Sequence, residues 1–109
     1  MKKLKPQAED SYFNLIASIA NNAISKVSGV TKEVGLVKYK FGLTALKDRN
    51  VHVFIDGSSV IIDMFVNVDF GHSVPEVVCD LQEQIKNDVE DATMFTVKKI
   101  NVTVANINL

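Results

Sequence analysis

The residues that could do chemistry are few, and their spacing joins them into no known reactive set. No Gly-rich loop is present to hold a phosphate, and no group of Cys and His residues has the spacing of metal ligands. The expected strand pattern brings no Ser or Cys nucleophile to a histidine. The sequence therefore predicts no catalytic residues, no metal site and no organic cofactor, and it favours a protein that is not an enzyme.

The candidate reactive residues each have a simpler structural interpretation. His52 is expected to face Asp63 on the exposed side of a hairpin. His72 precedes a predicted helix, whose free amides can hold an anion, but a plain turn residue is favoured. Cys79 lies off the apolar stripe of that helix, so we expect it to be exposed, and no basic neighbour in sequence stabilises its thiolate. Met64 is predicted to be a core residue.

Length and composition indicate one soluble globular domain over residues 1–109. Apolar residues make up 47% and charged residues 23% of the chain, which are ordinary values. The lone cysteine excludes an internal disulfide and fits a reducing compartment. The basic start is followed at once by Pro6 and acidic residues, and no apolar run is long enough to cross a membrane. We therefore expect neither a signal peptide nor a membrane span.

The two halves of the chain carry opposite charge. Residues 1–50 contain nine Lys or Arg and four Asp or Glu, whereas residues 51–109 contain three and nine. The basic half could meet an anionic membrane surface or a nucleic acid. Weak attraction between the two halves is favoured instead, because no dense Lys/Arg stripe with interleaved aromatic residues is present.

The best-defined element is a hairpin between residues 51 and 70. From Val60 to Phe70 every even position is apolar, and this period of two predicts a strand with one buried face. An alternating segment precedes it, and Gly57-Ser58 supplies a two-residue turn. Only one register keeps both apolar sets on one face. It predicts these facing pairs: Ile55 with Val60, Val53 with Ile62, Val51 with Met64, Phe54 with Ile61 and His52 with Asp63.

A first helix is predicted from Asp10 or Ser11 to about Ser28, after a frayed polar tail over residues 1–9. Gly29 should end it in the left-handed conformation, with Val30 folding back on the last turn. The apolar stripe of this helix is wide enough to pack against a sheet. The stripe consists of Phe13, Ile16, Ala20, Ile24 and Val27, widened by Tyr12, Ala17, Ile19 and Ala23.

A second helix and a final strand follow the hairpin. Ser73-Val74-Pro75-Glu76 has the form of a capping box, in which Ser73 caps the helix and Glu76 reaches back. An alternating strand then runs through Ile100 and Val104, and an apolar phase shift near Ala105-Asn106 predicts a bulge or the end of the strand. The helix stripe consists of Val74, Val77, Val78, Leu81, Ile85, Val89 and Ala92.

Together these elements predict an α+β fold with the order helix, irregular segment, strand, strand, helix, strand. Both helices should cover one face of a mostly antiparallel sheet of three or four strands. Residues 31–50 are expected to be irregular, with at most one edge strand through Val37, Tyr39 and Phe41. The final strand could lie parallel beside residues 60–70 through a right-handed crossover, or antiparallel beside Val51–Ile55. The antiparallel arrangement is favoured.

The uncovered face of this sheet is the predicted interaction surface. It should carry Phe54, Ile61 and Phe65, with Lys99 nearby. Apolar side chains lying side by side form a patch that soluble proteins tend to cover or use. The cover could be residues 31–50, a second copy of the chain or a different protein.

Several short motifs follow one another along the chain in a characteristic order and spacing. They are Val27–Val30, Asp56-Gly57, Val68–Gly71, Ser73–Val77, Leu81–Lys86 and Ile100–Val104. In this order and spacing they resemble the alkaline shock protein family of Gram-positive bacteria, also called the general-stress or envelope stress response family. The resemblance covers residues 10–107, and its most specific part is the strand, turn and helix from Asp69 to Lys86. The chain departs from the family pattern at Asn50 and Met94, where members often carry Gly.

The resemblance implies a small non-enzymatic protein of the cytoplasm, which gathers at the inner face of the cell membrane by binding a membrane-anchored protein. Members of this type are also encoded beside enzymes of fatty-acid or lipid metabolism, so a regulatory partner of such an enzyme is the alternative. A small nucleic-acid-binding domain is a third alternative. Because the chain lacks a Gly-x-x-Gly clamp and stacked strand aromatics, we expect a protein partner and no nucleic acid.

Overall fold

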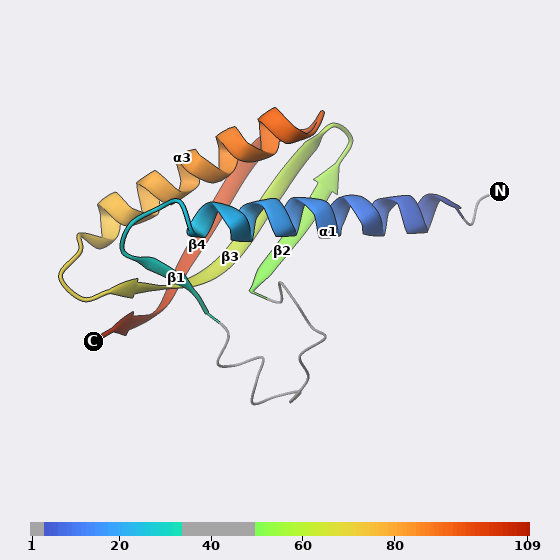
Figure 1. Cartoon of the computed structure of the whole chain (residues 1–109). Helices are drawn as coiled ribbons and strands as arrows, with labels where there is room; N and C mark the ends of the chain where they lie inside the picture. The colour runs from blue at the N-terminus through green and yellow to red at the C-terminus, as the bar shows by residue number, and fades with distance from the viewer. Residues whose placement is uncertain (1–3, 34–49) are drawn as a thin grey trace, which may run out of the picture.

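The computed structural model describes residues 4–33 and 50–109, with side chains from residue 11 onward. In these residues two helices cover one face of a four-stranded sheet, which is the α+β fold predicted above (Figure 1). The elements in chain order are α1 (Leu4–Ile24), β1 (Val30–Lys32), β2 (Val51–Asp56), β3 (Ser59–Asp69), α3 (Val74–Ala92) and β4 (Thr96–Asn108).

Strand β3 is the centre of the sheet, and its hairpin with β2 has the predicted register. Val53 faces Ile62, Phe54 faces Ile61 and His52 faces Asp63. The two-residue turn places Gly57 at φ 63°, a left-handed conformation that glycine adopts without a steric penalty. The alternation of apolar residues was therefore sufficient to define this pairing to the residue.

Strand β1 was not predicted. Val30 begins this short antiparallel strand, facing Val68 near the end of β3. Strands β1 and β2 lie one after the other along the same edge of β3 (Figure 1). The edge strand expected through Val37, Tyr39 and Phe41 lies outside the described residues.

The favoured position of the final strand was wrong. Strand β4 runs parallel to β3, with Ile62 facing Ile100 and Met64 facing Val102, and does not lie antiparallel beside β2. The length of the strands explains this choice. β4 has 13 residues, and β3 offers an edge of 11 residues where β2 offers only 6. The intervening helix carries the chain back along the sheet, as a parallel connection requires.

The phase shift near Ala105 is a register irregularity, as predicted. Val66 faces Val104 while Asn67 faces Asn106, so Ala105 is the additional residue. A second shift, between Val60 and Ile61, makes Lys98 an additional residue and was not predicted.

Helix α1 begins and ends earlier than predicted. It starts at Leu4, so residues 4–9 are helical and not a frayed tail. A proline at position 6 fits there, because N–H groups of a first helical turn have no partner within the helix. The helix ends at Ile24, and the N–H groups of Ser25, Lys26 and Val27 each bond a carbonyl three residues back. Gly29, at φ 88°, then turns the chain in the left-handed conformation, as predicted.

The predicted capping box of α3 was also wrong. Ser73 is the N-cap residue, but its side chain makes no capping hydrogen bond. A cap side chain bonds the N–H of the second or third helical residue, and Pro75 removes the first of these donors. At the other end the Thr93 hydroxyl donates to the Val89 carbonyl, and Thr93 is extended. A left-handed residue is therefore not needed there.

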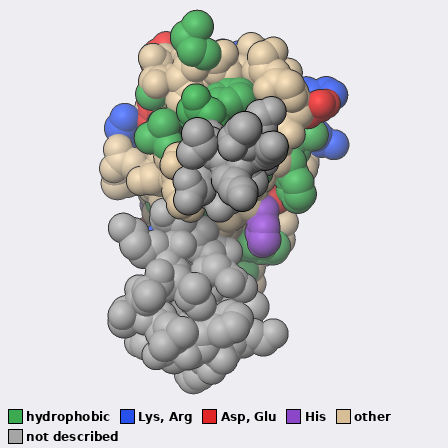
Figure 2. Space-filling view, turned by 90° about the vertical axis from the view of Figure 1, so that its right-hand side faces the viewer, with side chains coloured by type: hydrophobic (Ala, Val, Ile, Leu, Met, Phe, Trp, Pro, Cys, Tyr) green, Lys and Arg blue, Asp and Glu red, His purple; other side chains and the backbone are tan. Residues whose placement is uncertain are grey.

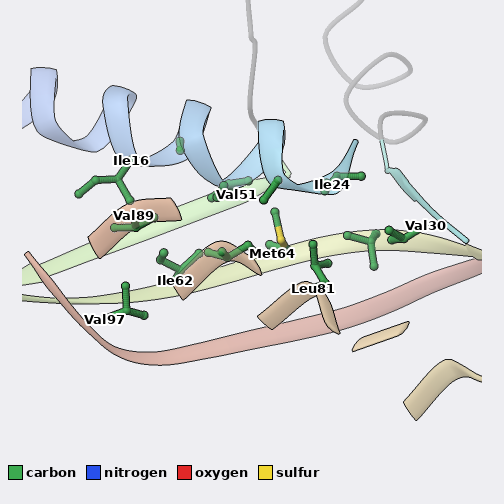
Figure 3. Packing of buried hydrophobic residues seen from close by; sticks show 14 of the residues in the cluster. Ile16, Ile24, Val30, Val51, Ile62, Met64, Leu81, Val89 and Val97 are labelled. Carbon is green, nitrogen blue, oxygen red and sulfur yellow. The ribbon is translucent and has the colours of Figure 1, made fainter. Parts of the chain in front are cut away.

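The core lies between the helices and the covered face of the sheet (Figure 3). The even-numbered residues of β3 point into it, and Met64 is 1% exposed, as predicted. The alternation ends before Phe70, which is 74% exposed. The largest fully buried side chains are Ile16, Ile62, Met64, Leu81, Ile85, Val60, Val66, Val68 and Val89.

One buried polar residue ties α1 to the sheet. Asn50 is 4% exposed, and its amide exchanges two hydrogen bonds with the amide of Asn21, at 2.9 and 3.1 Å. Asn50 also donates to the Phe65 carbonyl at 3.3 Å. Neither residue was assigned this role from the sequence.

Candidate interaction surface

The open face of the sheet is built from rows of side chains that cross the strands. Residues that face each other in neighbouring strands point to the same side of a sheet. Phe54, Ile61 and Lys99 therefore form one row across β2, β3 and β4. Phe54 is 52% exposed and Ile61 is partly exposed, so three of the four predicted surface residues lie together.

Phe65 lies on the same face but apart from this row. It faces Thr103 and is 41% exposed. Four residues along a strand separate it from Ile61, which corresponds to about 13 Å. The open face thus carries two apolar positions rather than the single continuous patch that the sequence suggested.

A polar row separates the two apolar positions. His52 faces Asp63, as predicted, and Asp63 faces Asn101 on the other side. The Asn101 side chain donates a hydrogen bond of 2.6 Å to the Asp63 carboxylate. This short bond holds the carboxylate between the two aromatic side chains, where a partner could also donate to it.

Polar side chains continue along the face toward the end of β3. The Asn108 amide donates to the Thr31 hydroxyl at 3.0 Å and to the Asp69 carboxylate at 2.9 Å. The Asn67 amide donates to Glu33 at 3.0 Å, while the buried Asn67 carbonyl oxygen has no hydrogen-bond partner among the described residues. Apolar exposure on this face is therefore concentrated at the Phe54 row and at Phe65.

The remaining candidate residues do not join this surface. His72 packs against Gly29, where an added Cβ atom would lie 2.5 Å from its Nδ1 atom. Cys79 is exposed and lines a shallow groove of about 450 Å³ between α3 and β4. Glu90, near the end of this groove, accepts the Val97 N–H, and this bond, helped by Lys86, lowers the pKa of its carboxyl group.

In residues 4–33 and 50–109 no group of three or more His, Cys, Asp or Glu side chains lies close enough to hold a metal ion. No helix in the same part of the chain is long and apolar enough to cross a membrane. Hydrophobic side chains reach the surface in several separate places between charged ones (Figure 2).

The fold and this surface define a small two-layer α+β domain with one open sheet face. Residues 7–109 match the model of the alkaline shock protein 23 family, which is described as having a cell envelope-related function. The chain belongs to this family, as its motifs indicated.

Two proteins of Bacillus subtilis (strain 168) are similar along most of their length. The uncharacterized protein YqhY is 28% identical, over 95% of this chain and 84% of its own. The uncharacterized protein YloU is 26% identical, over 87% of this chain and 83% of its own. No solved structure matches the chain.

Proposed function

We propose that this protein is a non-enzymatic interaction module of the envelope stress response, held at the inner face of the cell membrane by a partner protein. The observation that supports this proposal most is the open sheet face, with two exposed Phe side chains on either side of an ordered polar row. Membership of a family with a cell envelope-related function supports the cellular setting.

The arrangement of this face suits a protein partner. Burying one large apolar side chain stabilises a complex by about 1.5–3 kcal/mol, so Phe54 and Phe65 can anchor the contact. The Asp63 carboxylate, held by Asn101, offers an acceptor between these anchors and fixes the orientation of the partner. The partner should therefore present two apolar pockets about 13 Å apart, with a hydrogen-bond donor between them.

The test compares Phe54→Asp/Phe65→Asp with the wild-type protein in affinity capture from envelope and cytosolic fractions, followed by mass spectrometry. Phe70→Asp is the matched control, because Phe70 is more exposed and lies beyond the end of β3. The double variant should fold and lose a membrane-anchored partner that Phe70→Asp retains.

Other outcomes decide against parts of the proposal. If the double variant unfolds, the two Phe side chains belong to internal packing and the proposal fails. If it folds and keeps every partner, the interaction site lies elsewhere. Loss of a fatty-acid or lipid-metabolism enzyme, with no membrane-anchored protein captured, would replace envelope recruitment by enzyme regulation.

A further inference from the structure

Strand β4 leaves one long edge of the sheet unpaired. Among the described strands it pairs only with β3, along one side of its 13 residues. Backbone N–H and C=O groups on the other side of an edge strand are a template for a further strand, and proteins normally protect them. The protection of the β4 edge differs between its two halves.

The first half of this edge is protected by α3. Glu90 accepts the Val97 N–H at 2.8 Å, and the Gln82 amide donates to the Ile100 carbonyl at 2.9 Å. The additional residue in this half is Lys98, and bulges and lysines are common protections of edge strands. These features prevent another strand from pairing with Val97–Ile100.

The second half of the edge lacks these side-chain bonds, although it contains an additional residue of its own, Ala105. Residues two apart in a strand direct their backbone groups to the same side, so Val102 and Val104 point theirs outward as Ile100 does. In the described part of the chain no side chain hydrogen-bonds to the backbone of Val102 or Val104. The same strand is thus closed at its start and open toward its end.

One row of side chains on α3 changes from polar to apolar in the direction in which the β4 edge changes from closed to open. Positions 74, 78, 82 and 86 lie four apart on one side of the helix, and Gln82 marks the side that faces the β4 edge. Four helical residues rise about 6 Å and two strand residues about 6.6 Å, so, counted from the Gln82–Ile100 contact, Val78 is expected at the level of Val102 and Val74 at the level of Val104. Both valines are only half-buried, whereas the neighbouring Val77 and Leu81 are buried. The row is polar above the closed half and apolar above the open half.

We propose that the edge of β4 from Val102 to Ile107, beneath Val74 and Val78, receives an extended segment of a partner protein as an additional strand. This inference deepens the proposed function, because it states which backbone form the partner brings. Alternate apolar residues of the segment pack on the two valines, and its backbone bonds Val102 and Val104. Ile107 is already 44% exposed and extends the apolar strip.

The positive charge at the closed end of the β4 edge determines in which direction the partner segment runs along it. Lys98 and Lys99 are exposed at the closed end of the edge, and neither forms an ion pair with a described residue. Lys86 beside them is already paired with Glu90. An acidic residue that follows the paired part of the segment, beyond Val102, therefore lies on the side of two lysines that form no ion pair with a described residue.

A second copy of the chain fits this edge less well. Two copies related by a two-fold axis pair antiparallel strands, and full overlap of the two strands places the open half of one β4 on the closed half of the other, which Glu90 and Gln82 occupy. Overlap of the two open halves alone brings no acidic residue to the lysines, because residues 101–109 contain none. A separate strand can pair with Val102–Ile107 without reaching the closed half.

The test uses a synthetic peptide of alternating Thr and Val residues that ends in two Glu, titrated into the full chain labelled with ¹⁵N. A second peptide with two Lys in place of the two Glu is the charge control. The Val102 and Val104 amide signals should shift and exchange more slowly with solvent. The Lys peptide replaces two exposed ion pairs by repulsion between like charges, so it should bind about tenfold more weakly than the Glu peptide.

Val104→Pro removes one outward N–H and should abolish peptide binding, whereas Val104→Thr keeps that N–H and the β-branched shape and should retain it. If Val104→Pro does not fold, Val78→Asp places a charge above the edge and should have the same effect. Phe54→Asp/Phe65→Asp should bind the peptide normally, which separates this inference from the open-face proposal.

Four results would overturn the inference. They are unchanged binding by Val104→Pro or Val78→Asp, peptide-induced shifts on the Phe54 row, no binding of either peptide at millimolar concentration, and a concentration-dependent dimer that protects the Val102 and Val104 amides without peptide.

Discussion

Replacing Gly29 by Ala tests the contact between the end of α1 and the turn before α3. Gly29 has φ 88°, and a Cβ atom there would lie 2.5 Å from Nδ1 and 2.7 Å from Cγ of His72. Gly71 has nearly the same conformation, φ 93°, but nothing lies within 4 Å of its Cβ position. Gly71→Ala is therefore a control that carries the backbone strain without the steric overlap.

The two costs can be estimated separately. A left-handed conformation costs an L-residue about 1–2 kcal/mol, so Gly71→Ala should lower the free energy of unfolding by that amount. In Gly29→Ala the His72 ring must also turn away, because Cγ lies at the base of the ring and cannot bend aside. His72 is exposed, so this second cost should lie near the low end of overpacking, about 1 kcal/mol. We expect Gly29→Ala to cost about 2–3 kcal/mol.

Urea unfolding followed by far-ultraviolet circular dichroism measures these differences, since the chain contains no Trp. His72→Ala completes the cycle: combined with Gly29→Ala it should recover about 1 kcal/mol, and combined with Gly71→Ala it should recover nothing. Equal midpoints for the two glycine variants, or a Gly29→Ala cost that His72→Ala leaves unchanged, would refute the reasoning.

Three further predictions concern polar contacts. Asn50→Ala removes the two hydrogen bonds to the Asn21 amide and the bond to the Phe65 carbonyl, and it should lower the free energy of unfolding by about 1–3 kcal/mol; a urea midpoint within error of the wild type would contradict this. Because the pKa of Glu90 is lowered in the folded protein, its carboxylate stabilises the fold fully above the ordinary glutamate pKa. This stabilisation of the fold is lost as the pH falls through the lowered pKa. Between pH 5 and pH 3, roughly the range around the ordinary glutamate pKa, the free energy of unfolding should therefore fall less for Glu90→Gln than for the wild type. If the free energies of unfolding of the two proteins fell in parallel over this range, the result would argue against this. Ser73→Ala should change the free energy of unfolding by less than about 0.5 kcal/mol, because the Ser73 side chain makes no capping bond. A loss of about 1 kcal/mol would show instead that Ser73 does cap the helix.

The sequence was most informative where one residue period decides the structure. The alternation in residues 51–68 has only one register that buries both apolar sets, and the hairpin has that register. The stripe of α3 likewise predicted its buried residues, Val77, Leu81, Ile85 and Val89. In both cases burial of apolar surface outweighs the other local preferences.

The sequence was least informative where the outcome depends on which elements become neighbours. The three residues of β1 carry no alternation that distinguishes a strand from a loop. The position of β4 depends on the edge length that β3 and β2 offer, which no local pattern in residues 96–108 contains. The roles of Glu90 and Gln82 follow from that position, so they could not be assigned earlier.

The candidate surface was predicted by residue but not by arrangement. Strand parity placed Phe54, Ile61, Phe65 and Lys99 on one face, and each strand does carry them there. The distance between Phe65 and the Phe54 row was already implied by four residues of extended chain, yet the polar row between them depends on Asn101, whose partner could be named only once β4 lay parallel to β3.

The parallel position of β4 also links the two proposed contact regions. It brings Lys99 beside Ile61 on the open face, and it brings Lys98, the next residue back, to the outer edge. A partner that covers the Phe54 row and a segment that pairs with the open half of β4 would therefore meet at these two lysines. If one partner makes both contacts, the second contact forms within an existing complex at a high effective concentration, so two weak contacts would together give stable recruitment. Variants of the open face and of the edge should then weaken capture of that partner by more in combination than their separate effects in isolated assays would indicate.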